Sequence, residues 1–200
     1  TGGDEEFGND QSKFEQLHDV QHVGAFGSGF LCTRADGSLV TVGDLVWESS
    51  FSELEVQEIY STARQIRECV VECAAAILAD GSVVSWGSHG YGGYDSVKEQ
   101  LKSVHELSAT DTAFAAIRTD GSVVTWGNVT CGGESSRVQD QLRNVQQIQA
   151  GSTAFAALLA DGSVVAWGDQ SSGGDFSNVE SQLKNVGKIY ASGSAFAAVL

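Results

Sequence analysis

Short runs of apolar residues recur along this chain at nearly constant intervals, and each run leads through the same turn into a second apolar run. The clearest copy is residues 154–168, AFAALLADGSVVAWG, and related copies occupy 113–127, 74–87, 30–43 and the start of a fifth at 195–200. Successive turns are 44, 40 and 41 residues apart. A regular interval of this length identifies a repeat protein. The turn residues are Asp36-Gly37, Asp80-Gly81, Asp120-Gly121 and Asp161-Gly162.

Asp-Gly between two apolar runs predicts a β-hairpin, because a two-residue type I′ turn needs φ > 0 at both central residues. Pairing outward from such a turn places Ala156 opposite Trp167 and gives the same Ala–Trp pairing in two other copies. In the first copy it places Leu31 opposite Val42. The apolar runs are continuous rather than alternating, so we expect strands covered on both faces. The tryptophans that follow this strand period, and are expected in the core, are Trp86, Trp126 and Trp167.

The rest of each copy predicts one more strand and an outer element. A Gly-Gly-acid loop follows each Trp-Gly in the later copies, and then comes the pattern Val-x-x-Gln-Leu-x-x-Val at 97–104, 138–145 and 179–186. The spacing of that pattern fits either a turn or two of helix or an irregular strand. A strand over 145–150 then leads into the next hairpin. Each unit of about 41 residues therefore contains three or four antiparallel strands, which is typical of a propeller blade.

We therefore expect an all-β fold, a β-propeller, built as one repeat array over residues 1–200. Its predicted parts are the end of a preceding repeat at 1–29, a divergent repeat at 30–73, regular repeats at 74–113, 114–154 and 155–194, and the start of another at 195–200.

These repeats resemble those of the regulator of chromosome condensation family, most clearly in Asp120-Gly-Ser-Val-Val-Thr-Trp-Gly127 and the strand segment before it. The resemblance covers nearly the whole chain. It implies a seven-bladed β-propeller, for which about 41 residues per blade would require roughly 290 residues. We therefore expect a partial propeller belonging to a longer polypeptide. The family's Gly-x-x-His before the inner strand is missing, because Ser152, Thr153 and Ala154 follow Gly151. Its Asn-x-x-Gly-Gln-Leu-Gly loop is reduced to the Gly-Gly-acid loop.

Charge and composition narrow the classes of partner. The formal net charge is −15, from 26 acidic and 11 basic residues, which disfavours nucleic acid because its phosphates require Lys and Arg. The same charge argues against binding to anionic lipid, and no apolar run approaches the roughly 18 residues of a membrane span. The cysteines do not recur at equivalent repeat positions, so we expect free, partly buried thiols: Cys32, Cys69, Cys73 and Cys131.

The chain carries no pattern that we interpret as a catalytic, cofactor or metal site. His18 and His22 have the spacing of helical metal ligands, but no third ligand lies beside them in the sequence. The spacing of Cys69 and Cys73 also resembles that of metal ligands, but their segment is predicted as strand. No nucleophile elbow or phosphate-binding loop occurs. We therefore expect a protein that is not an enzyme and uses no cofactor.

The best signal for a partner site is a set of basic residues at equivalent positions of successive repeats, which we call the basic column. Lys102, Arg143 and Lys184 are 41 residues apart and should lie on one rim of the array. Exposed aromatic residues in a Gly-rich loop also suit a protein interface. The candidate contacts in and near such loops are Trp47, His89, Tyr91 and Tyr94.

These features predict a scaffold or protein-interaction module that binds protein partners, with a place in a large multi-subunit assembly as a variant. The alternative that the resemblance implies is regulatory. It is guanine-nucleotide exchange on a small GTPase, or substrate recognition for a ubiquitin ligase.

Overall fold

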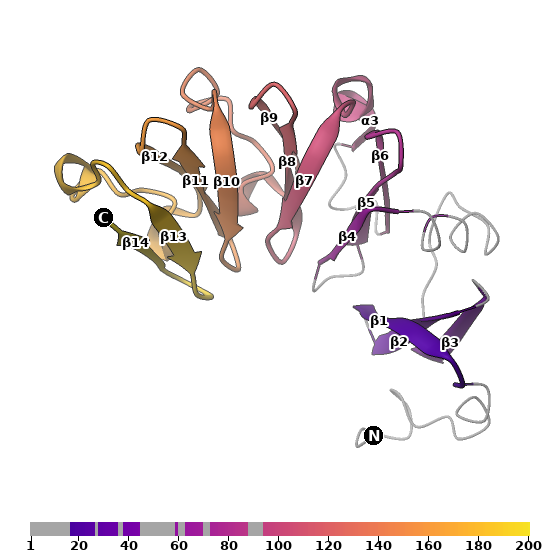
Figure 1. Ribbon diagram of the computed structural model, residues 1–200. Coiled ribbons are helices and arrows are strands. Elements are labelled where there is room, and N and C mark those ends of the chain that lie inside the picture. The colour runs from indigo at the N-terminus through magenta and orange to yellow at the C-terminus, as the bar shows by residue number, and fades with distance from the viewer. Residues whose placement is uncertain are drawn as a thin grey trace.

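The computed structural model describes residues 17–26, 28–35, 38–44, 59, 63–69, 73–87 and 94–200. Within them the chain forms five antiparallel sheets of consecutive strands, four with three strands and one with two (Figure 1). The all-β propeller architecture expected from the repeats is confirmed. The predicted candidates Trp47, His89 and Tyr91, and the first turn, Asp36-Gly37, lie outside the described residues.

Each sheet is formed by the strand before an apolar hairpin and the two strands of that hairpin. The first sheet contains β1 (Val20–Phe26), β2 (Ser28–Arg34) and β3 (Leu39–Asp44), and the second β4 (Gln65–Glu68), β5 (Cys73–Ile77) and β6 (Val83–Gly87). The third contains β7 (Val104–Ala109), β8 (Ala113–Arg118) and β9 (Val123–Gly127). The fourth contains β10 (Val145–Ala150), β11 (Ala154–Leu159) and β12 (Val164–Gly168), and the fifth β13 (Lys188–Ala191) and β14 (Phe196–Val199).

The Asp-Gly hairpins close with three residues rather than the predicted two. The Leu159 N–H donates to the Ser163 carbonyl at 2.9 Å, and the Gly162 N–H donates to the Leu159 carbonyl at 3.0 Å. Gly162 has φ +79°, whereas Asp161 is not among the residues with positive φ. A three-residue loop that ends in a left-handed glycine is the next commonest hairpin after the two-residue types. The Asp161 carboxylate stabilises it by accepting from the Ser163 N–H at 2.9 Å.

This loop shifts the pairing by one residue, so the predicted Ala–Trp register is wrong. Trp167 pairs with Phe155 and Trp126 with Phe114. In the second sheet Trp86 pairs with Ala74 rather than with Ala75. In the first sheet Val42 pairs with Phe30, and the predicted exchange of volume between Leu31 and Val42 does not exist.

In the described residues the outer element consists of short helical turns and other turns, and no fourth strand forms there. Its helical turns are α3 (Tyr94–Val97), η2 (Lys98–Gln100) and η5 (Glu180–Gln182). Two further helical turns, η3 (Val129–Cys131) and η4 (Gln170–Ser172), lie in the Gly-Gly loops. η3 and η4 begin alike, because the side chains of Asn128 and Asp169 accept from the backbone N–H two residues on. They also end alike, at glycines with φ +93°.

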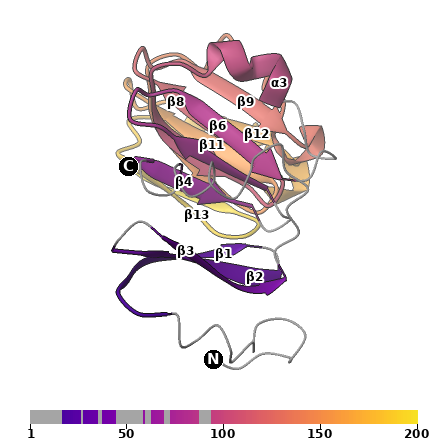
Figure 2. The same cartoon turned by 90° about the vertical axis from the view of Figure 1, so that its right-hand side faces the viewer.

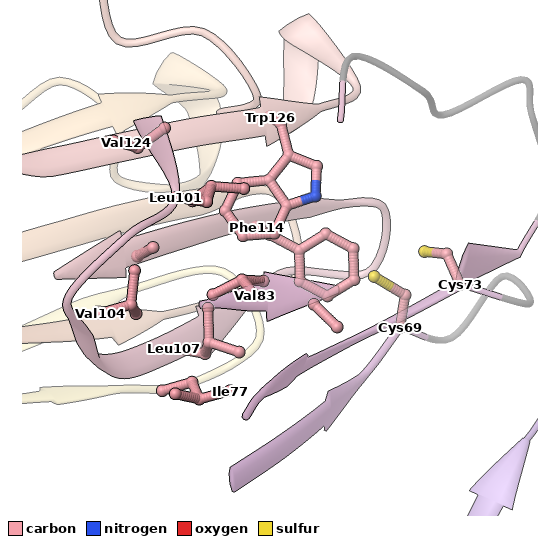
Figure 3. Packing of buried hydrophobic residues seen from close by; sticks show 12 residues of the cluster. Cys69, Cys73, Ile77, Val83, Leu101, Val104, Leu107, Phe114, Val124 and Trp126 are labelled. Carbon is pink, nitrogen blue, oxygen red and sulfur yellow. The ribbon is translucent and has the colours of Figure 1, made fainter. Parts of the chain in front are cut away.

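The second, third and fourth sheets lie one behind another (Figure 2). Their middle strands, β5, β8 and β11, are buried over almost their whole length. Phe114 and Trp126 of the third sheet pack against Ala75 and Ile77 of the second in one core (Figure 3). Residues on the other face of β8 pack against the fourth sheet in the next core. Small alanines on one sheet thus meet aromatic rings on the next. The expectation that the continuous apolar runs are covered on both sides is confirmed for β5, β8 and β11, whereas β14, which carries the fifth run, is mostly exposed.

A glycine from each outer loop packs against the aromatic pair of the following sheet. A Cβ added at Gly132 would lie 2.6 Å from the Phe155 ring, and the Gly132 carbonyl accepts from Trp167 Nε1 at 3.0 Å. A Cβ at Gly173 would likewise lie 2.7 Å from the Phe196 ring. The Gly-Gly loops are therefore packing elements that join neighbouring blades.

Candidate interaction surfaces

Because the strands alternate in direction, their ends form two rims. The turn rim contains the Asp-Gly turns (79–82, 119–122 and 160–163) and the residues that enter each first strand (102–103, 143–144 and 184–185). The loop rim contains the loops between first and second strands (110–112, 151–153 and 192–195) and those after the third strands (128–134 and 169–175).

On the turn rim, the hairpin turn of each sheet is hydrogen-bonded to the entrance of the next. The Val145 N–H donates to the Gly121 carbonyl at 3.0 Å, and the Val186 N–H donates to the Gly162 carbonyl at 3.0 Å. The residues immediately before these valines, Asn144 and Asn185, both have φ +56°. A residue in this left-handed conformation turns the chain into the new blade, and asparagine adopts it more readily than most side chains.

The predicted basic column lies beside these junctions. Lys102 and Arg143 are exposed, and each pairs with an acid three residues earlier: Lys102 Nζ lies 2.8 Å from Glu99 and Arg143 lies 3.7 Å from Asp140. Lys184 is exposed and makes no ion pair with any described residue. The structure thus brings the three side chains to equivalent positions of one rim.

The aspartates of the turns are charged and hydrogen-bonded on the same rim. The Ser82, Ser122 and Ser163 side chains and N–H groups donate to the carboxylates and lower the pKa values of Asp80, Asp120 and Asp161. Arg118 also pairs with Asp120 at 3.0 Å. Acidic and basic groups are therefore interspersed along this rim.

The loop rim differs from the turn rim in charge. Its described residues contain no Lys or Arg, and its acidic residues are Asp111, Glu134, Asp169 and Asp175. Hydrogen bonds from the backbone and side chain of Ser171 lower the pKa of Asp169, and those from Ser177 lower the pKa of Asp175. Both carboxylates are therefore ionised near neutral pH.

Backbone bonds hold neighbouring loops of this rim together. The Asp111 N–H donates to the Ser152 carbonyl at 2.9 Å, and the Ser152 N–H donates to the Gly193 carbonyl at 2.7 Å. The loops of three successive sheets are thus joined in one row. Asp111 lies in this row, and the loops that carry Glu134 and Asp169 are bonded to it, because the Asn128 N–H donates to the Thr112 carbonyl at 2.9 Å and the Asp169 N–H donates to the Thr153 carbonyl at 3.0 Å. A partner can therefore recognise the acidic side chains without ordering a flexible loop.

Polar side chains between the first strands bind the backbone of the next sheet. The Gln65 amide accepts from the Leu107 N–H at 2.8 Å and donates to the Leu107 carbonyl at 3.2 Å. The Ser108 hydroxyl donates to the Ile148 carbonyl at 3.0 Å. Glu106 is half-buried, and this burial raises its pKa. The bonds of Gln65 and Ser108 join blades to one another.

Tyr94 is the one predicted aromatic contact within the described part of the chain, and it is half-buried rather than exposed. Its hydroxyl donates to the Val83 carbonyl at 2.8 Å, and its ring packs against the core between the second and third sheets. Gln139 performs the same task one blade on, since its amide donates to the Val123 carbonyl at 3.0 Å. These bonds satisfy carbonyls on the outer edges of β6 and β9.

A groove of about 640 Å³ lies on the outer edge of the fourth sheet, along β12 and between successive outer segments. Val164, Phe176 and Lys184 are among its lining residues. No group of three His, Cys, Asp or Glu side chains in the described ranges is arranged to hold a metal ion. Among the same residues, no helix has the length and apolarity needed to cross a membrane.

The sequence pattern predicts only part of the acidic loop rim. Glu134 and Asp175 are the acids of the Gly-Gly-acid loops, but Asp111 lies in a different loop and Asp169 caps a helical turn. The signal that could have found the rim is the absence of Lys and Arg from both types of loop, taken together with the alternation of strand direction.

Comparison with known proteins agrees with this architecture. Residues 145–173, which run from β10 through β12 into the Gly-Gly loop, match the family model of the regulator of chromosome condensation (RCC1) repeat. No curated protein matches the chain.

Solved structures with a similar fold include yeast RCC1 (Prp20) bound to Kap60, with TM-score 0.55, 14% identity and 89% of this chain covered. The ectodomain of the Physcomitrella patens receptor kinase CR4 matches with TM-score 0.56, 20% identity and 92% coverage. The CRINKLY WD40 ectodomain of the Arabidopsis thaliana receptor kinase ACR4 matches with TM-score 0.54, 19% identity and 90% coverage.

The chain spans 53%, 50% and 64% of the length of these three structures, in the same order. At these identities the structural likeness shows the fold, and the repeat match supports the family to which the sequence pattern pointed. The chain is a β-propeller repeat protein in which residues 145–173 form a repeat of the regulator of chromosome condensation type.

Proposed function

We propose that this chain is a non-enzymatic protein-interaction module that binds a protein partner with a basic surface through its loop rim. The observation that carries the proposal is the difference in charge between the rims. The described loop rim has four acidic side chains and no Lys or Arg, while acidic and basic side chains are mixed on the turn rim. A surface of one sign attracts and orients a partner of the opposite sign.

Rigidity supports the same proposal. The acidic side chains project from loops that are joined to one another by backbone hydrogen bonds and rest on close-packed sheets. A preorganised surface loses little conformational entropy when a partner binds. The basic column of Lys102, Arg143 and Lys184 is a weaker candidate for this partner site, because two of its members already pair with neighbouring acids.

Yeast RCC1 (Prp20) has been solved in complex with Kap60, so at least one propeller of similar fold binds another protein. Membership in a multi-subunit assembly and the regulatory alternative, nucleotide exchange or ubiquitin-ligase substrate recognition, both fit such a module. Neither has support in the side chains of this chain.

The test is affinity capture with the intact chain, followed by quantitative mass spectrometry at low and moderate salt. One variant neutralises the loop rim by Asp111→Asn, Glu134→Gln and Asp175→Asn, and a matched variant neutralises the turn rim by Lys102→Gln, Arg143→Gln and Lys184→Gln. We expect a stoichiometric partner to be lost from the first variant, retained by the second, and weakened by salt.

Loss from the turn-rim variant alone would place the site on the basic column instead. Capture of a small GTPase or of ubiquitin-ligase components would favour the regulatory alternative. Circular dichroism and thermal unfolding of both variants must match those of the unsubstituted chain, because a folding defect would remove any partner.

A further inference from the structure

Cys69 and Cys73 lie opposite each other where β4 and β5 meet at the loop rim. The Cys69 N–H donates to the Cys73 carbonyl at 2.7 Å, so the two residues extend the ladder that pairs Glu68 with Ala74. Both side chains are 5% exposed and belong to the core between the second and third sheets. Figure 3 shows their sulfur atoms near one another, on the side of Phe114.

The two side chains belong to one buried cluster. The neighbouring Cys73 thiol, together with burial, raises the pKa of Cys69. Residues directly opposite in an antiparallel pair have Cα atoms about 4.5 to 5.5 Å apart. A disulfide needs a Cα separation of roughly 4.4 to 6.8 Å, so the backbone here can accept one without moving far.

In the next two blades, other residues stand at the positions equivalent to Cys69 and Cys73, and hydrogen bonds alone join them. Thr110 and Ala113 occupy these positions in the third sheet, where the Thr110 N–H donates to the Ala113 carbonyl at 2.9 Å and the Ala113 N–H donates to the Thr110 hydroxyl at 3.0 Å. Gly151 and Ala154 occupy them in the fourth sheet with the backbone bond alone. The other free cysteines, Cys32 and Cys131, lie in different cores.

From this geometry we propose that Cys69 and Cys73 form a reversible disulfide when the protein meets a small oxidised disulfide such as oxidised glutathione. One cysteine thiolate attacks the glutathione disulfide, which forms a mixed disulfide and releases one glutathione thiolate. The second cysteine, as its thiolate, attacks the protein sulfur and displaces the other glutathione. Two protein thiols lose two electrons and two protons, and oxidised glutathione becomes two molecules of reduced glutathione.

The bond would cross-link β4 and β5 at the rim end of the second sheet. It therefore adds a covalent closure to a hairpin that the other blades close by hydrogen bonds. This inference concerns oxidation alone and does not rest on the proposed partner site.

The sequence permits a direct test on the intact chain. After oxidation at mildly alkaline pH, which increases the thiolate fraction of any thiol, free thiols are blocked and the protein is digested with a Glu-specific protease. Cleavage after Glu68 and Glu72 separates Cys69 from Cys73. We expect the peptide 69–72 and the peptide 73–99 to remain joined until a reductant is added, and we expect oxidation to raise the thermal midpoint of unfolding.

Three variants complete the design. Cys131→Ser should keep both the cross-link and the rise in thermal midpoint, whereas Cys73→Ala and Cys69→Ala should abolish both. Stable mixed disulfides with glutathione at Cys69 or Cys73, or recovery of both as blocked free thiols, would overturn the proposal. The peptide readout on the unsubstituted chain decides the matter even if a core alanine variant fails to fold.

Discussion

Phe155 and Trp167 face each other across β11 and β12, with ring centroids 5.2 Å apart and ring planes at 23°. The same pair occurs one blade earlier, where Phe114 and Trp126 stack at 5.2 Å and 19°. Each pair fills the space between two sheets, and the Trp167 ring nitrogen bonds to the Gly132 carbonyl of the preceding outer loop. The aromatic pair therefore contributes both to strand pairing within one blade and to packing between two blades.

Removing this contact should show coupling between its two residues. We expect Phe155→Ala and Trp167→Ala each to lower the free energy of unfolding by about 3 to 5 kcal/mol. The double variant should be less destabilised than the sum of the singles by about 0.5 to 1.5 kcal/mol, because stacked rings contribute beyond their buried area. Urea unfolding measures all three, and a parallel cycle of Trp167→Ala with Leu101→Ala, which lies in another core, should be additive.

Gly132→Ala should be strongly destabilising. Its φ is +93° and an added Cβ would lie 2.6 Å from the Phe155 ring, so both backbone strain and overpacking result. We expect a loss of about 2 kcal/mol or more. Gly187→Ala is the matched control, since the nearest atom to its added Cβ is 3.8 Å away. Equal thermal midpoints for the two variants would contradict the packing described for the outer loop.

Acid should weaken the hairpin turns. Hydrogen bonds from Ser163 lower the pKa of Asp161 in the folded state, so this stabilisation is fully present above the unfolded pKa of about 3.9 and is lost as pH falls through the folded value. Asp161→Asn should therefore reduce the loss of stability between about pH 5 and pH 2. The measurement is the urea midpoint across this range, with Asp140→Asn, an exposed substitution on the same rim, as the comparison.

The Gln65 amide should contribute to the joint between the second and third sheets. Gln65→Ala removes the partner of the Leu107 N–H, whereas the Leu107 carbonyl still accepts from Arg67 Nε at 3.1 Å, and we expect a cost of about 1 to 3 kcal/mol from the unpaired N–H. Gln146→Ala changes an exposed first-strand glutamine in the fourth sheet and should lie within about 0.5 kcal/mol of the unsubstituted chain. Chemical unfolding measures the stability of both variants. A similarly small loss for both would contradict a role of Gln65 in joining the blades.

Much of the architecture follows from local sequence patterns, which predict the same elements whatever the tertiary contacts are. The recurrence of Asp-Gly between apolar runs predicts hairpins, and the interval of about 41 residues predicts blades. The continuous apolar runs predict strands buried on both faces, because a strand with one exposed face would alternate. The spacing of Lys102, Arg143 and Lys184 likewise predicts that they share a rim.

The sequence by itself therefore determined the strands of the hairpins, their order and the repeat. The tertiary structure decided the register, because Asp161 bonds to the Ser163 N–H and only Gly162 adopts positive φ, which lengthens the turn by one residue. It also decided that Asp111 and Asp169 share the acidic rim, and that Cys69 and Cys73 meet at the end of one hairpin. These are relations between loops whose side-chain directions depend on where each strand ends, and local sequence does not specify them.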